Sequence, residues 1–71
     1  MAIYKRTVGR RSEAYGLGLR RGSATGREEP WDRDWQWLAD ETDGRIQTDQ
    51  DDCHDFACGM RDGARAAAEA S

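Results

Sequence analysis

The sequence predicts a mainly α fold: one small domain over residues 1–71, in which two glycine-faced helices pack antiparallel and a short tryptophan-rich helix covers them. Three observations predict it. A motif containing Gly-x-x-x-Gly occurs twice, apolar residues recur at steps of three and four, and capping residues precede the helical stretches. A chain of 71 residues has room for one core that is barely large enough to fold alone.

Residues 1–11 could form a basic arm or a short strand. Residues 2–8 include the β-branched and aromatic residues that strands favour, and Gly9 would end such a strand. The same segment is rich in basic residues, and we favour the arm over the strand.

The first helix is expected over residues 12–26. Ser12 is a good N-cap, and Glu13 suits the positive end of the helix dipole. Gly18 and Gly22 lie four residues apart and therefore on one face. Glycine inside a helix costs about 1 kcal/mol relative to alanine. Close approach of a second backbone would explain why this face keeps its glycines.

The second helix is expected over residues 30–42. Proline suits the first turn of a helix, so Pro30 marks the start. Gly44 is expected to stop the helix just beyond its last turn.

The three tryptophans of this helix divide into two groups. Trp31, Trp35 and Leu38 fall on one stripe, so both of these tryptophans are expected in the core, where aromatic rings bury a large area. Trp37 points elsewhere and is expected on the surface, where it could contact a partner or a second copy in a homodimer.

The third helix is expected over residues 49–69, with Thr48 or Asp49 as its N-cap. Apolar and small residues recur there at steps of three and four, which is typical of an amphipathic helix. The stripe consists of Cys53, Phe56, Ala57, Met60, Gly63, Ala64 and Ala67. Polar residues, Asp55 and Arg61 among them, are expected on the solvent side.

Residues 56–63 repeat the pattern of residues 15–22: an aromatic residue, two residues, glycine, leucine or methionine, arginine, one residue, glycine. We therefore expect the first and third helices to meet glycine face to glycine face. The expected contact residues are Ala14, Gly18, Gly22, Phe56, Gly59, Met60, Gly63 and Ala67.

No catalytic, nucleotide-binding or metal-binding set of residues is complete. Gly16, Gly18 and Gly22 have helical spacing and no preceding strand, which disfavours a dinucleotide loop. His54 and Cys58 lie four apart and could share a metal ion, but zinc needs three or four ligands. The same pair lacks the third group that would make it catalytic. We expect no enzyme activity, no cofactor and no metal.

The charge of the chain is divided. Residues 1–27 hold seven basic residues and one acidic residue, a net +6, whereas residues 28–71 hold four arginines and thirteen acidic residues, a net −9. The two halves could simply neutralise each other, within one molecule or across a dimer. Alternatively, guanidinium groups bind phosphates, and a basic arm beside a helix suits RNA. The expected RNA- or partner-binding residues are Lys5, Arg6, Arg10, Arg11, Arg20, Arg21 and Arg27.

Residues 56–62, Phe-Ala-Cys-Gly-Met-Arg-Asp, resemble the aromatic-x-x-Gly-aromatic-Arg-Glu motif near the C-terminus of ribosome modulation factor. Ala14, Tyr15 and Gly18, followed by Pro30-Trp31, look like the first helix and the Pro-Tyr pair of that family. The wider family includes small plasmid and phage proteins similar to the ciprofloxacin-resistance protein. This chain departs from the pattern in its longer connector and in its net charge of −3.

The resemblance and the basic N-terminal third together predict a non-catalytic modulator that binds the ribosome or other RNA. The acidic remainder supports an alternative: an inhibitor from a phage or other mobile element, like an anti-CRISPR protein, that binds a nucleic-acid-binding host protein complex. The resemblance alone implies a third function, modification of an antibiotic.

A cytoplasmic location is expected. Charged residues make up 35% of the chain and the mean hydropathy is −1.02, so no membrane span is predicted. Polar residues follow Lys5 and Arg6, which disfavours a signal peptide. Cys53 and Cys58 are too few for a disulfide framework and are expected to stay reduced.

Overall fold

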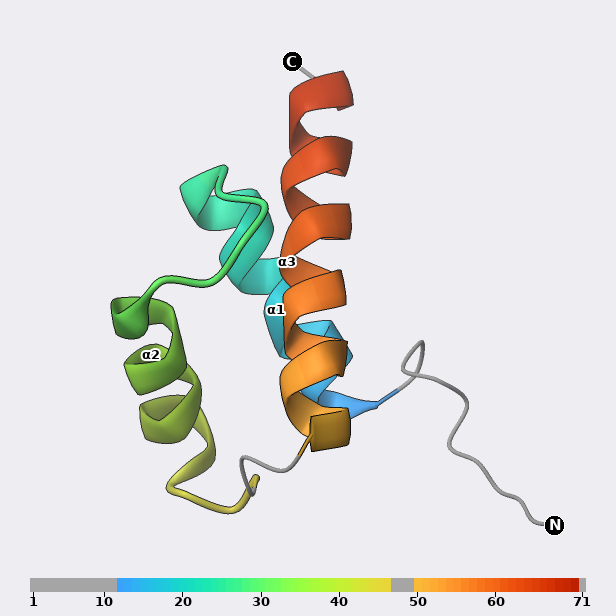
Figure 1. Cartoon of the computed structure of the whole chain (residues 1–71). Coiled ribbons are helices and arrows are strands. Elements are labelled where there is room, and N and C mark those ends of the chain that lie inside the picture. Colours follow the sequence, from blue (N-terminus) through green and yellow to red (C-terminus); the bar gives the residue numbers. More distant parts are fainter. Residues whose placement is uncertain (1–11, 47–49, 71) are drawn as a thin grey trace, which may run out of the picture.

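The computed structural model describes residues 12–46 and 50–70, which form three helices and, within those ranges, no strand (Figure 1). Helix α1 spans Glu13–Thr25, α2 spans Asp32–Thr42 and α3 spans Gln50–Ala70. The predicted mainly helical fold is confirmed. The arm or strand expected over residues 1–11 and the N-cap expected at Thr48 or Asp49 lie outside the described residues.

Helix α1 begins and ends where its capping residues place it. The Ser12 side chain accepts a hydrogen bond of 3.0 Å from the backbone N–H of Tyr15. At the other end Gly26 takes the left-handed conformation, with φ of 77°, and donates its N–H to the carbonyl oxygen of Gly22 at 2.8 Å.

Helix α2 begins two residues later than the sequence predicts. Its N-cap is Trp31, so Pro30 lies just outside the helix instead of in its first turn. The helix ends at Thr42, and the two residues that follow it, Asp43 and Gly44, have positive φ values of 54° and 72°. The predicted stop at Gly44 is therefore correct to within one residue.

Helices α1 and α3 touch through their main chains, as the glycine pattern predicts. A Cβ atom added to Gly59 would lie 2.9 Å from the Cα of Gly18, and one added to Gly63 would lie 3.0 Å from the Cα of Leu19. A Cβ on Gly22 would lie 2.7 Å from the Cα of Met60. Real Cβ atoms essentially never approach other atoms closer than 3.0 Å. Only glycine therefore permits this spacing of the two helices.

The direction of this packing differs from the prediction, because α1 and α3 run parallel. Gly59 faces Tyr15 and Gly18, and Gly63, one turn later in α3, faces Leu19, later in α1. Helix α2 runs back along the pair, so α3 starts at the same end as α1 (Figure 1). The antiparallel expectation was wrong because glycines spaced four residues apart form the same flat ridge in either chain direction. The spacing therefore predicts the contact between the two helices but not whether they run parallel or antiparallel.

The core is small and centres on Phe56. Its buried apolar residues are Ala14, Leu38, Phe56, Met60 and Ala64. The rings of Trp35 and Trp37 pack on Phe56, with centroids 5.1 and 6.4 Å away. Trp31, expected in the core, is 55% exposed, and Trp37, expected on the surface, is partly buried. The two tryptophans exchange their expected places because Trp31 precedes α2 and so does not follow the helical stripe.

Asp55 is buried, with 3% of its surface exposed, although the sequence places it on the solvent side of α3. It lies four residues before Gly59 and eight before Gly63, on the ridge that contacts α1. The apolar stripe alone does not reveal this, because the ridge consists of glycines and one carboxylate.

Candidate functional site

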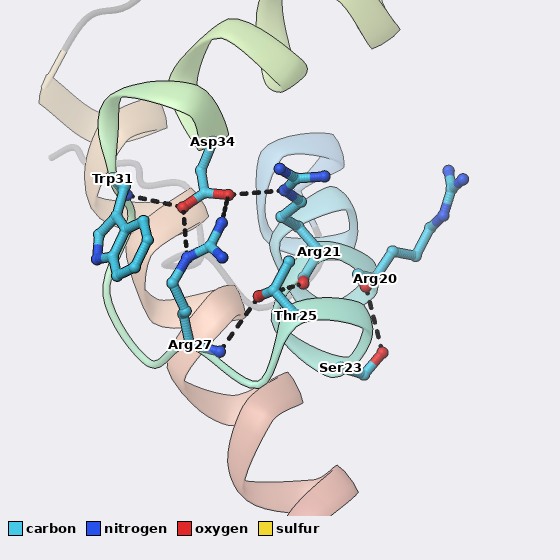
Figure 2. A network of polar contacts seen from close by, with 7 residues as sticks. All are labelled: Arg20, Arg21, Ser23, Thr25, Arg27, Trp31 and Asp34. Carbon is cyan, nitrogen blue, oxygen red and sulfur yellow. Dashed lines mark hydrogen bonds and ion pairs between the residues drawn. The ribbon is translucent and has the colours of Figure 1, made fainter.

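The most concentrated polar cluster in the described part of the chain surrounds Asp34, in the first turn of α2 (Figure 2). Its side chain is completely buried. It accepts hydrogen bonds from Nε of Arg21 at 2.7 Å, from Nε of Arg27 at 3.2 Å and from the backbone N–H of Trp31 at 2.7 Å. The Nη2 group of Arg27 donates a further, short hydrogen bond to the same carboxylate.

These partners keep Asp34 ionised. Burial by itself raises the pKa of the carboxyl group, but the hydrogen bonds from Arg27, the Trp31 backbone and Arg21 outweigh burial and hold the pKa below its ordinary value. A buried carboxylate with two guanidinium partners and a backbone donor is thus electrically satisfied inside the fold.

The Asp34 cluster joins three consecutive parts of the chain: α1 through Arg21, the α1–α2 connection through Arg27, and α2 through Asp34 itself (Figure 2). Thr25 strengthens the corner, since its hydroxyl donates to the carbonyl oxygen of Arg21 at 2.9 Å and accepts from the N–H of Arg27 at 3.2 Å. The cluster fixes the point at which the chain turns back.

The structure thus gives Arg21 and Arg27 a role different from the predicted one. Both side chains are only 20% exposed and are engaged with Asp34, so neither is free to bind a phosphate. Arg20 remains accessible: it is 67% exposed, and its nearest carboxylate oxygen, on Glu41, is 4.0 Å away. The other predicted binding residues, Lys5, Arg6, Arg10 and Arg11, lie outside the described residues.

The sequence analysis missed Asp34, although two signals point to it. It stands three residues after the N-cap Trp31, where a carboxylate commonly accepts the N-cap N–H. It also shares a four-residue spacing with Leu38 and Thr42, the two other buried residues of α2.

The tryptophans frame this cluster in two different ways. The guanidinium carbons of Arg20 and Arg21 lie 5.9 and 5.2 Å from the centroid of Trp37, on a ring that also contacts Phe56. The predicted partner surface at Trp37 is therefore largely covered by the protein itself. Trp31 is instead the large apolar side chain that the described part exposes, with Arg27 stacked 4.3 Å from its ring.

A second polar group lies on α3, away from Asp34. Nε2 of His54 and Sγ of Cys58 are 3.5 Å apart across one helical turn. They line an open cleft of about 280 Å3 together with residues of the α1–α2 connection. Within the described ranges, no group of three or more histidine, cysteine, aspartate or glutamate side chains could hold a metal ion.

The described residues carry seven arginines and thirteen acidic residues, a net charge of −6, whereas residues 1–11 hold four basic residues and no acidic one. Six of those seven arginines lie within 4.0 Å of a carboxylate oxygen. Only Arg21 and Arg27 are largely buried in these pairs, at 20% exposure; the side chains of Arg20, Arg45, Arg61 and Arg65 are 43–67% exposed.

None of the helices in the described part is long and apolar enough to cross a membrane. No protein-family model, no curated protein and no solved structure matches the chain.

Proposed function

We propose that this protein is a non-catalytic modulator that binds RNA through its basic N-terminal segment, and that the RNA it binds is ribosomal. The observation that carries the proposal is the separation of charge between residues 1–11 and the acidic helical part. The binding set is narrower than the sequence predicts, because Arg21 and Arg27 hold Asp34. It comprises Lys5, Arg6, Arg10, Arg11 and Arg20.

The acidic helical part supports a one-sided contact. Its net charge of −6 repels phosphates, so RNA would approach from the end at which residues 1–11 join α1. Arg20 is the exposed member of the predicted set on α1 itself. Tyr15 would not supply a base-stacking ring, because its hydroxyl donates to Asp62 at 2.6 Å and ties the side chain to α3.

The resemblance to ribosome modulation factor supports the choice of the ribosome. In this chain the residues that carry the resemblance include Gly18 and Gly59, which meet in the helix contact. The resemblance therefore mainly supports a shared helical scaffold, whereas the positive charge of residues 1–11 supports RNA as the ligand.

Binding to a labelled single-stranded RNA and to purified ribosomes, measured between 50 and 300 mM salt, tests the proposal. With four or five phosphate contacts, the logarithm of the binding constant should fall with the logarithm of the salt concentration with a slope of about −3. Replacing Lys5, Arg6, Arg10 and Arg11 together by alanine should abolish binding at physiological salt. The matched control replaces the exposed arginines Arg33 and Arg65 and should leave the slope unchanged.

Two results would overturn the proposal: no RNA binding at the lowest salt, or equal binding by the quadruple variant. Affinity purification with and without nuclease treatment shows whether the bound partner is RNA or a protein. The alternative would be favoured if a nucleic-acid-binding protein is still recovered after nuclease treatment and is also recovered with the quadruple variant. In that alternative, acidic side chains such as Asp40 and Asp43 occupy a basic surface of the partner protein.

A further inference from the structure

We propose that Cys58 is a reactive thiol that forms a mixed disulfide with a small peptide disulfide that carries ammonium and carboxylate groups, such as oxidised glutathione. The site is the open cleft of about 280 Å3 between α3 and the α1–α2 connection. Its lining residues are Glu28, Glu29, His54, Ala57, Cys58 and Arg61. The proposal is independent of RNA binding.

The geometry supplies a nucleophile with a base. Sγ of Cys58 lies 3.5 Å from Nε2 of His54, within hydrogen-bond range for sulfur. Both residues lie on the solvent side of α3, because His54 is exposed and Cys58 is partly buried at the edge of the cleft. Reactive cysteines are typically partly exposed and lie beside a histidine or another basic group.

The exchange is balanced without any further reactant. His54 accepts the proton of the Cys58 thiol, and the thiolate attacks one sulfur of the incoming disulfide. A new S–S bond forms as the old one breaks, and the second half of the disulfide leaves as a thiolate, which takes the proton back from His54. The Cys58 sulfur is oxidised, and the departing sulfur is reduced.

The charges around the cleft suit a ligand that carries both signs. Glu28 and Glu29 come from the α1–α2 connection, and Arg61 comes from α3, one turn after Cys58. Among the described residues Glu29 has no ion-pair partner, so it can receive an ammonium group. Nε of Arg61 lies 3.3 Å from Oδ1 of Asp62, but the Arg61 side chain is still 43% exposed, so it can share its guanidinium group with a ligand carboxylate. Each half of oxidised glutathione carries one ammonium group and two carboxylates on one small peptide.

Cys53 provides an internal control. It lies on the same helix, is also partly buried, and has no hydrogen-bond partner among the described residues. It does not line the cleft. Any general reactivity of thiols in this protein should therefore appear at both cysteines, whereas the proposed site predicts a difference between them.

The test incubates the full-length protein with oxidised glutathione and follows intact mass and peptide masses over time. We expect one glutathione adduct, located on Cys58, and a rate about tenfold higher in the Cys53→Ser variant than in Cys58→Ser. His54→Gln should lower the Cys58 rate about tenfold with the helical circular dichroism signal unchanged. Arg61→Gln should slow the reaction with glutathione disulfide but not with uncharged hydroxyethyl disulfide.

Equal rates at the two cysteines would overturn the proposal, as would a Cys58 rate that does not change in His54→Gln. If Cys58 reacts faster but Arg61→Gln slows both disulfides equally, the assignment to a ligand that carries charged groups is wrong. If the Cys58→Ser variant does not fold, peptide masses of the unsubstituted protein still give the ratio of the two rates.

Discussion

The buried carboxylate of Asp34 determines the role of the two arginines beside it. Two arginines that look like surface cations in the sequence become internal counterions once α2 folds back on α1. Both guanidinium groups share the single Asp34 carboxylate, which offsets one of their two positive charges. Together with the Thr25 hydrogen bonds, these contacts fix the α1–α2 corner. A binding study that mutates Arg21 or Arg27 would therefore measure folding and not recognition.

Replacing Asp34 by alanine should destabilise the protein by about 3 kcal/mol, because it leaves two largely buried guanidinium groups without their carboxylate. Urea unfolding followed by circular dichroism measures this change. Asp32→Ala is the matched control, since Asp32 is exposed in the same turn and supplies only a helix-dipole interaction of about 0.3–1 kcal/mol. Equal losses in the two variants would contradict the role assigned to the buried cluster.

The same carboxylate predicts the response to acid. The pKa of Asp34 is lower in the folded than in the unfolded protein, so the unfolded chain takes up this proton first as the pH falls. Its contribution to stability is complete above about pH 4, the ordinary aspartate pKa, and is lost as the pH falls through the folded value. The pKa of Glu13 is likewise lowered, by its hydrogen bond from Arg45, and adds to the effect.

Unfolding midpoints measured from pH 6 to pH 2 should therefore fall steeply below pH 4 in the unsubstituted protein. The fall should be shallower in Asp34→Asn, which cannot titrate at this position. Parallel pH curves for the two proteins would show that Asp34 does not contribute to the acid sensitivity.

At the scale of the helices, the contact between α1 and α3 depends on the absence of side chains. Gly18 and Gly59 face each other, Gly22 lies against the backbone of Met60, and Gly63 lies against the backbone of Leu19. A Cβ atom added at any of these four glycines would overlap with main-chain atoms. Backbone atoms cannot move aside as a flexible side chain can, so the helices would have to separate.

Alanine at Gly18, Gly22, Gly59 or Gly63 should cost about 1–3 kcal/mol through overpacking, and leucine at Gly59 or Gly63 should cost more. Thermal unfolding measures the loss. Gly16→Ala is the control, because it lies in α1 with nothing within 4 Å of the added atom. That variant should gain up to about 1 kcal/mol from its better helix propensity. A gain at all five positions would contradict the glycine contact.

The sequence allowed the helices to be predicted, but not their direction or their buried charges. Helical periodicity and caps such as Ser12 are local, so the bounds of α1 and α3 agree with prediction within one residue. Parallel packing depends on where α2 leads the chain, which no local pattern records. Asp34 and Asp55 are buried through tertiary contacts, and hydrophobicity alone assigns carboxylates to water.

At the scale of the molecule, α2 is attached differently from the other two helices. The described fold measures 42 × 24 × 14 Å, so its thinnest dimension is little more than the diameter of one helix. The α1–α3 contact is made of backbone, whereas α2 is held by the rings of Trp35 and Trp37 on Phe56 and by the Asp34 cluster. Segments with few buried apolar residues open at a lower free energy than the rest of a fold, and α2 buries one such residue, Leu38, whereas α3 buries Phe56, Met60 and Ala64.

Hydrogen-exchange rates should therefore differ between α2 and the α1–α3 pair. Amides of α2 should exchange about tenfold faster than those near Gly18 and Gly59, because α2 can detach while the glycine contact persists. Asp34→Ala should accelerate exchange in α2 and leave the relative protection of the α1–α3 contact unchanged. Uniform exchange rates over all three helices would instead show that the protein opens as a single unit.

A junction built from glycine places no demand on the residues that face outward from α1 and α3. Mutations can replace the outward-facing residues, and so change which ligand is bound, while the crossing of α1 and α3 persists. Sequence identity between descendants of such a protein will therefore fade long before their shape does. Kinship is best sought in two pairs of glycines four residues apart, each three residues after an aromatic side chain, and not in overall similarity.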